Sequence, residues 1–237
     1  MAESQQVGQV SDRIVIAEGV HVVLRRSARA RRMTLRVPRD GTDPVLTLPL
    51  RVPLAEGQAF ALSKSEWLRQ AQARIPQPRR AEAGAAIPVA GRALTITPAD
   101  LRICRIEGDA LLVPQGRPVA ATVQAFLKHL AISALRPACD RHAAALGRDY
   151  RAIALRDTRS RWGSCSSDGR LMFSWRLAMA PPEVLDYVAA HEVAHLAHMD
   201  HSPRFWAAVA GLMPDWRARR DWLRQNGGDL MLWRFRD

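Results

Sequence analysis

The sequence predicts an α+β fold in which a β-rich first part precedes a mainly helical second part. Short alternations of apolar and polar residues, typical of half-buried strands, recur from Ile14 to about Pro114. From about Val119 onward, apolar residues recur mostly at helical spacing, with two strand-like segments among the helices. A sheet followed by helices is the pattern of an α+β protein.

The first part is expected to hold one helix among its strands. Strands are predicted at Met33–Val37 and Val45–Leu50, and turns at residues 90–92 and 107–109. The helix is predicted from about Leu54 to Ile75, where apolar residues share one face and Pro76 follows. Its aromatic residues, Phe60 and Trp67, are expected in the core. Residues 1–13 are predicted to be a disordered tail and residues 14–118 a β-rich subdomain.

The second part, residues 119–237, is predicted to be a separate domain built on helices. Its elements are expected as a long helix at Val123–Leu146, strands at Ala152–Leu155 and Leu171–Trp175, a helix from Pro182 to about His198, a helix begun by Ser202 and Pro203, and a last helix capped by Asp215 that ends before Gly227. The short segment from Trp162 to Cys165 is interpreted as a tight turn beside the helix that ends near His198.

Composition excludes several classes of protein. Hydrophobic residues make up 48% of the 237 residues and charged residues 24%, as in an ordinary globular protein. No apolar run approaches the ~18 residues of a membrane span, so no membrane partner is expected. The first dozen residues lack the apolar stretch of a secretory signal. Three cysteines without a close pair favour a reducing, cytoplasmic setting. The sequence does not indicate an oligomeric state.

The chain is strongly basic, and arginine supplies nearly all of the positive charge. The formal net charge is +12, and only Lys64 and Lys128 are lysines. Seven arginines lie between Arg25 and Arg39 without an acidic residue among them. This cluster could contact a polyanion or a nucleotide. The alternative is a solvated surface of an arginine-rich protein.

The strongest chemical motif is H-E-x-x-H, formed by His191, Glu192 and His195 in a predicted helix. Residues four apart lie on the same face of a helix, so the two imidazoles can converge on one zinc ion. The helix is apolar on nearly every side, which predicts burial. Two histidines and a glutamate buried without partners would be costly, and a metal ion removes that cost.

A catalytic zinc ion is usually held by three protein ligands and keeps one position open. No glutamate follows Glu192, and His198 lies ~10.5 Å along the helix from His191. His201 immediately precedes the next helix and can return to the metal if the first helix has ended. The predicted ligands of one Zn²⁺ are therefore His191, His195 and His201. Asp200 and Asp215 stay open as alternatives, and His198 is expected at the rim.

Several further segments resemble the YgjP-like zinc metallopeptidase family, which is distantly similar to SprT-like and WLM-type zincins. They are Arg161–Ser166, Leu171–Leu177, Ala180–Pro182, Asp186–Val188, the H-E-x-x-H motif and His201–Trp206. The resemblance is dense from Thr158 to Trp206 and covers one unit of about residues 25–235. One departure is Ser174, where relatives often have asparagine. The His195 to His201 spacing equals that of metzincins, but His198 occupies the position of their glycine.

The resemblance implies a zincin-like catalytic half with the same three histidine ligands and Glu192 as the catalytic acid and base. Glu192 would accept a proton from water activated by the metal and pass it to the leaving amine. Arg161, Tyr187 and Ser174 are candidate substrate or oxyanion contacts, with a structural role as the alternative for Arg161 and Tyr187. The Leu171–Trp175 strand is the candidate for pairing with a peptide or protein substrate.

The leading hypothesis is therefore a zinc-dependent metallopeptidase. One alternative is a nucleotide pyrophosphatase or phosphohydrolase that uses the same metal site. Another is a DNA-associated, SprT-like protease. A binding protein with a purely structural zinc is the least favoured hypothesis, because structural sites leave no open position.

Overall fold

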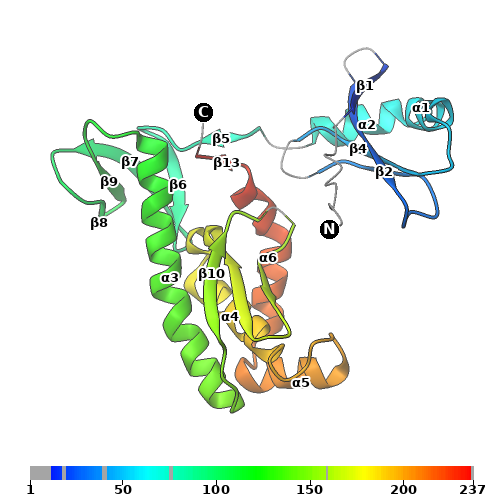
Figure 1. The fold of residues 1–237 in the computed structure, drawn as a ribbon. Coiled ribbons are helices and arrows are strands. Elements are labelled where there is room, and N and C mark those ends of the chain that lie inside the picture. Colours follow the sequence, from blue (N-terminus) through cyan, green and yellow to red (C-terminus); the bar gives the residue numbers. More distant parts are fainter. Residues whose placement is uncertain (1–11, 18–19, 39–41, 75–76, 159, 236–237) are drawn as a thin grey trace, which may run out of the picture. The chain divides into compact units, whose positions relative to one another are not determined.

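The protein has an α+β fold, as the sequence predicts, and its chain divides into two compact units (Figure 1). The computed structural model describes residues 12–17, 20–38, 42–74, 77–158 and 160–235. Unit 1 is Met1–Gln77 and unit 2 is Pro78–Asp237. Most of the predicted tail, residues 1–13, lies outside the described residues. No helix among the described residues is long and apolar enough to cross a membrane.

Unit 1 is a four-stranded sheet with helices on one face. Its described elements are β1 (Asp12–Ala17), β2 (Val20–Ser27), β3 (Thr34–Arg36), β4 (Val45–Pro49), α1 (Leu54–Leu62) and α2 (Ser65–Ala73). The strand order is β1-β2-β4-β3, and β2 and β4 are the parallel pair. Val22, Leu46 and Leu48 are fully buried together with Ala61 of α1 and Leu68 of α2. The helices therefore cover the face of the sheet that carries these residues.

The single helix predicted from Leu54 to Ile75 is wrong, because the chain turns at Ser63 and Lys64 between α1 and α2. The Ser63 hydroxyl donates to the Phe60 carbonyl at 2.8 Å, a local bond that competes with continuation of the helix. Trp67 is 48% exposed rather than in the core, since Leu68 is the residue of α2 that turns inward. The predicted helix end at residues 75–76 lies outside the described residues.

Unit 2 contains the remaining elements. They are β5 (Arg79–Arg80), β6 (Ala86–Val89), β7 (Arg92–Ala99), β8 (Arg105–Glu107), β9 (Ala110–Pro114), α3 (Val119–Leu146), β10 (Ala152–Arg156), β11 (Gly163–Cys165), β12 (Arg170–Ser174), the 3₁₀ helix η1 (Trp175–Met179), α4 (Pro182–Ala194), α5 (Pro203–Leu212), α6 (Trp216–Met231) and β13 (Trp233–Arg234). Its sheets have the orders β6-β7-β9-β8, β10-β12-β11 and β13-β5.

The division at residues 77/78 differs from the boundary expected at residues 118/119. The β6–β9 sheet belongs with the helices because its apolar residues share their core. Ile87, Leu94 and Leu111 are in the same buried cluster as Val123 and Leu127 of α3. Strand-like sequence up to Pro114 did not reveal this, since the pattern of a strand does not specify what its buried face packs against.

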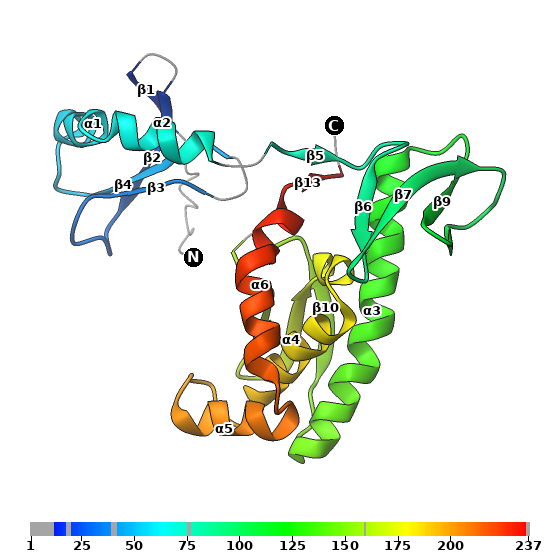
Figure 2. The ribbon, with the colours of Figure 1, turned by 180° about the vertical axis from the view of Figure 1, so that it is seen from behind.

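Helix α4 lies at the centre of unit 2, between α3 and α6 (Figure 2). Its apolar residues are buried on several sides, as its composition predicts. Asp186 of α4 accepts hydrogen bonds from Arg141 at 2.9 Å and from His142 at 3.0 Å, both on α3. Burial raises the pKa of Asp186, but the hydrogen bond and charge of His142 and the charge of Arg141 outweigh it, so the net shift is downward. This ionic contact fixes α4 against α3.

Two predicted boundaries in unit 2 are wrong, and both matter for the site. Helix α4 ends at Ala194 instead of about His198, and a turn follows at residues 195–197. Helix α6 continues through Gly227 and Gly228 to Met231. The prediction that Ser202 and Pro203 begin a helix is confirmed, because the Ser202 hydroxyl caps α5 by accepting from the Phe205 N–H.

Candidate metal centre

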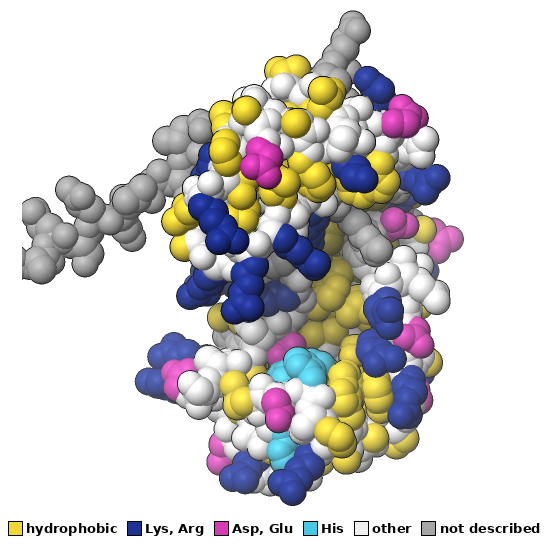
Figure 3. All heavy atoms as spheres, turned by 90° about the vertical axis from the view of Figure 1, so that its right-hand side faces the viewer, with side chains coloured by type: hydrophobic (Ala, Val, Ile, Leu, Met, Phe, Trp, Pro, Cys, Tyr) yellow, Lys and Arg dark blue, Asp and Glu magenta, His cyan; other side chains and the backbone are white. Residues whose placement is uncertain are grey.

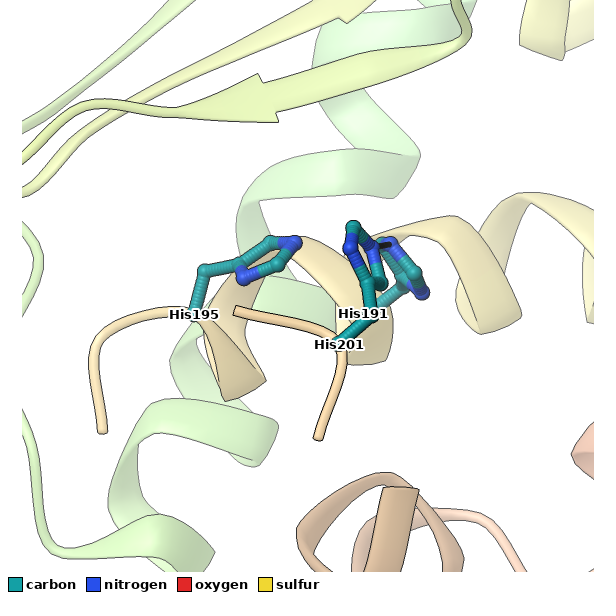
Figure 4. Close-up of side chains that lie close together, drawn as sticks. All are labelled: His191, His195 and His201. Atoms are coloured by element: carbon teal, nitrogen blue, oxygen red, sulfur yellow. Dashed lines mark hydrogen bonds between the residues drawn. The ribbon is translucent and has the colours of Figure 1, made fainter. Parts of the chain in front are cut away.

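His191, His195 and His201 come together on one side of α4 (Figure 4). One potential ligand atom from each residue lies within 4.8 Å of those of the other two. His191 is in α4, His195 is the residue that ends it, and His201 lies in the loop before α5. The early end of α4 is what allows this, since the chain turns back within residues 196–200. Histidine side chains of unit 2 reach the molecular surface in Figure 3.

The separation of two of the imidazoles fits a shared zinc ion. The Nε2 atoms of His191 and His201 are 3.2 Å apart. Two nitrogens at 2.0–2.1 Å from one tetrahedral zinc ion would be about 3.4 Å apart. The Nδ1 atom of His195 lies 2.9 Å from the His198 carbonyl, and because a carbonyl only accepts, Nδ1 must carry the proton. Nε2 of His195 is then left with the lone pair that a metal needs.

Burial favours the neutral form of His191 and His195, which is the form that binds metals. Burial lowers the pKa of His191 to about 3, and the charges of His195 and His201 act in the same direction. Burial also lowers the pKa of His195, against the hydrogen bond to the His198 carbonyl. The donor set is therefore suited to a divalent cation.

Glu192 is buried beside the histidines and packs directly against β11. Its side chain is on the inner side of α4, and the residue is only 5% exposed. Burial raises the pKa of its carboxyl group to about 8, while the charge of Arg161 lowers it. A cation held by the histidines would supply the positive charge that a buried carboxylate lacks.

Gly163 of β11 allows this close packing. A Cβ atom built at Gly163 would lie 2.5 Å from Oε1 and 2.6 Å from Cγ of Glu192. Its φ angle is not in the left-handed region, so the glycine is needed for space and not for backbone conformation. The segment interpreted as a turn is therefore a short strand whose backbone touches the glutamate of the motif.

The neighbouring Trp162 makes a second close contact, with α6. A Cβ atom built at Gly227 would lie 2.9 Å from Cζ2 of Trp162. The carbonyl of Trp162 accepts a hydrogen bond of 2.8 Å from the N–H of Ser174. Trp162 thus links α6 to β12, and the next residue, Gly163, meets Glu192. Neither glycine was recognised from the sequence, where Gly227-Gly228 indicated only a helix end.

Alanine substitutions at the two adjacent glycines of α6 should have opposite effects on stability. In Gly228→Ala the new methyl group has no described atom within 4 Å, so the higher helix propensity of alanine should raise the free energy of unfolding by up to about 1 kcal/mol. In Gly227→Ala the propensity also rises, but the methyl group would clash with the Trp162 ring. The free energy of unfolding should therefore fall by about 1–3 kcal/mol. Denaturant unfolding of both variants measures this, and an equal gain in stability would show that the contact is not tight.

The other residues predicted at the site occupy varied positions. Tyr187 is buried one turn before His191, with its ring centroid 6.0 Å from that of His191. Burial raises the pKa of Tyr187 to about 12. Arg161 is exposed and lies close enough to act on Glu192. Ser174 is completely buried, and its hydroxyl has no hydrogen-bond partner among the described residues.

Neither alternative third ligand joins the histidines in the described part of the chain. Asp200 accepts a hydrogen bond from the Ser202 N–H at 3.2 Å. Asp215 precedes α6 and binds Arg219 at 2.6 Å. His198 contributes its carbonyl to His195 rather than a ligand nitrogen. Cys165 lies near Glu192, and burial raises its pKa to about 11, which keeps it an unreactive thiol.

Comparison with known proteins decides the family. The sequence matches the family described as YgjP-like, metallopeptidase domain, over residues 31–226. The chain belongs to the YgjP-like metallopeptidase family. This confirms the resemblance carried by the segments between Thr158 and Trp206, and the YgjP-like match extends into unit 1. Membership makes a metal-dependent hydrolase the class of this protein.

Two other comparisons add little to the YgjP-like assignment. No match was found among curated proteins. Among solved structures, the chain is similar to the metallopeptidase zymogen abylysin of Pyrococcus abyssi, with 22% sequence identity and a TM-score of 0.35. That similarity covers 39% of this chain and 92% of abylysin.

Proposed function

We propose that this protein is a zinc-dependent peptidase whose metal is held by His191, His195 and His201. The observation that carries the proposal is the convergence of three imidazoles next to a buried glutamate. A bound zinc ion would polarise a peptide carbonyl and lower the pKa of a water ligand toward ~7. Three protein ligands leave a position open for that chemistry.

In this proposal Glu192 moves the proton. Its carboxylate accepts a proton from the attacking water and delivers it to the leaving amine. The packing against Gly163 holds the carboxyl group in place, so little reorganisation is needed. Arg161 is exposed and its charge acts on Glu192, so it is a candidate to contact the substrate.

The substrate backbone is proposed to pair with β11 and not with the Leu171–Trp175 strand expected from the sequence. β12 is paired on both sides, with β10 and β11, so it has no free edge. The bonds Ser174 N–H to Trp162 and Ser166 N–H to Arg170 show which residues of the β11 segment face β12. By the alternation of an antiparallel ladder, the N–H and C=O groups of Gly163 and Cys165 face the other way. No described strand pairs with that edge, so a peptide can add there.

The ligand set is tested by His201→Ala, with His198→Ala as the matched control. His201→Ala should bind less than one zinc per chain after dialysis and lose activity, because one of three donors is removed. His198→Ala should keep both the zinc and the activity, because the carbonyl that accepts the hydrogen bond from His195 belongs to the backbone and remains in the variant. Metal analysis after dialysis against zinc measures the difference. Zinc loss in His198→Ala but not in His201→Ala would contradict the proposed ligand set.

The reaction itself is tested by a substrate screen with and without chelator. Chelator-sensitive cleavage of an unstructured protein or a peptide library is expected. Release of phosphate or pyrophosphate from nucleotides, without peptide cleavage, would contradict the peptidase proposal while leaving the metal site intact.

A further inference from the structure

Five exposed arginines of unit 1 form a group around the β2–β3 connection, here called the arginine surface. Arg25 and Arg36 are in β2 and β3, and Arg29, Arg31 and Arg32 lie between these strands. Figure 3 shows a group of dark-blue Lys and Arg side chains on unit 1. Because these residues belong to the same sheet and its connecting loop, their charges are concentrated on one part of unit 1.

The arginine surface gathers several positive charges that no described carboxylate pairs with. Elsewhere most arginines with a described partner bind a carboxylate, as in Arg92–Asp109, Arg105–Glu107, Arg151–Asp168 and Arg219–Asp215. Arg26, beside the group, donates to the carbonyls of Pro49, the last residue of β4, and of Leu50 in the loop that follows. None of the five arginines has an ion pair or side-chain hydrogen bond within the described part of the chain.

The register of the sheet puts Arg25 and Arg36 of the arginine surface on the face opposite the helices of unit 1. Arg25 pairs with Thr47, and Thr34 pairs with the same Thr47 from the other side. Arg36 pairs with Val45. Cross-strand partners point to the same face, so Arg25 and Arg36 lie opposite the face that carries Leu46 and Leu48 under the helices. The two described helices of unit 1, α1 and α2, pack on the other face.

The chemistry of this face selects its ligand. Unpaired guanidinium groups with free N–H donors bind phosphate oxygens well. The strands β1, β2, β3 and β4 contain no Phe, Tyr or Trp. His21 of β2 is their one aromatic side chain, so the sheet lacks a row of aromatic rings on which successive unpaired bases could stack. A regular row of phosphates is therefore a better match than a splayed single strand.

We propose that the arginine surface binds the phosphate backbone of double-stranded nucleic acid without sequence preference. The catalytic unit plays no part in this contact, which requires neither the metal nor Glu192. Five phosphate contacts would give a slope of log K against log salt of about −4 to −5 on B-DNA. Binding would place the chain near proteins associated with nucleic acid.

The test compares two triple variants that each remove three positive charges from the full-length protein. Arg29→Ser, Arg31→Ser and Arg32→Ser alter the arginine surface. Arg102→Ser, Arg148→Ser and Arg224→Ser alter exposed arginines of unit 2. Fluorescence anisotropy with labelled 20-base-pair DNA and RNA duplexes, in chelator and across a salt series, measures affinity. Thermal unfolding verifies that both variants are folded.

The surface variant should bind at least tenfold more weakly at 100 mM salt, with a salt slope shallower by about 2.7, because each lost phosphate contact contributes about 0.9. The unit 2 variant should change affinity much less. Equal losses in both variants would overturn the proposal in favour of diffuse attraction by net charge. Absence of duplex binding at 50 mM salt, or tighter binding of a single strand or of polyglutamate, would also overturn it.

Discussion

Replacing Glu192 by glutamine is expected to lower kcat for peptide hydrolysis by about 10²–10⁴-fold, the usual contribution of a general base. Glutamine keeps the shape of the side chain that packs on Gly163, but it does not accept the proton. The three histidines are unaffected, so zinc content should stay at the wild-type level. Steady-state kinetics with metal analysis of the same preparation measures both.

A matched control for this substitution lies on the same helix. Glu183→Gln makes the same chemical change at an exposed residue in the first turn of α4, away from the histidines. It should retain wild-type kcat and zinc. If Glu192→Gln also retained full activity, Glu192 would not be the base, and Arg161 or Tyr187 would become the groups to examine.

Replacing Gly163 by alanine should impair activity strongly, although the residue carries no functional group. Its new methyl group would lie 2.5–2.7 Å from three atoms of the Glu192 side chain, so the carboxyl group must move. A displacement of about 1 Å at a catalytic group can cost ~10²-fold in rate. Overpacking should also lower the free energy of unfolding by about 1–3 kcal/mol. Kinetics, zinc content and denaturant unfolding measure the three effects.

A double-mutant cycle separates this contact from a general disturbance of β11. In a Glu192→Ala background the three crowding atoms are absent, so Gly163→Ala should then cost little stability. Gly228→Ala, where a methyl group meets nothing within 4 Å, is the control for adding a methyl group. An undiminished cost of Gly163→Ala in the Glu192→Ala background would show that the glycine serves another purpose.

The convergence of the histidines could be predicted from sequence because it depends on local geometry. His191 and His195 are one helical turn apart, and Ser202 and Pro203 mark where the next helix begins. The short connection between the two helices restricts the conformations of the chain, so His201 can take only a few positions relative to His191 and His195. Family membership and the α+β class were also predictable, because the motifs are dense and strands precede helices along the chain. Neither feature depends on the exact residue at which a helix or strand begins or ends.

The residues that pack around Glu192 were not predictable from the sequence, because contacts between distant parts of the chain determine which residues these are. A three-residue strand containing glycine and serine has the composition of a turn, and only pairing with β12 makes Gly163–Cys165 a strand. A glycine pair near a helix end normally indicates a stop, yet α6 continues past Gly227 with Trp162 packed against it. Trp67 was expected in the core because the turn at Ser63 was not recognised, and the turn rotates α2.

The loop of residues 196–200 joins the last donor on α4 to the one before α5, and its shortness restricts how the chain can vary. Removing or adding one residue there would shift His201 away from His191 and His195. The start of α5 is fixed by the Ser202 cap, so the helix would not readily move to restore the position of His201. Closing so short a loop costs little entropy, which favours the convergence of the three histidines. Homologues and engineered versions should therefore tolerate changes of residue type in this loop far better than changes of its length.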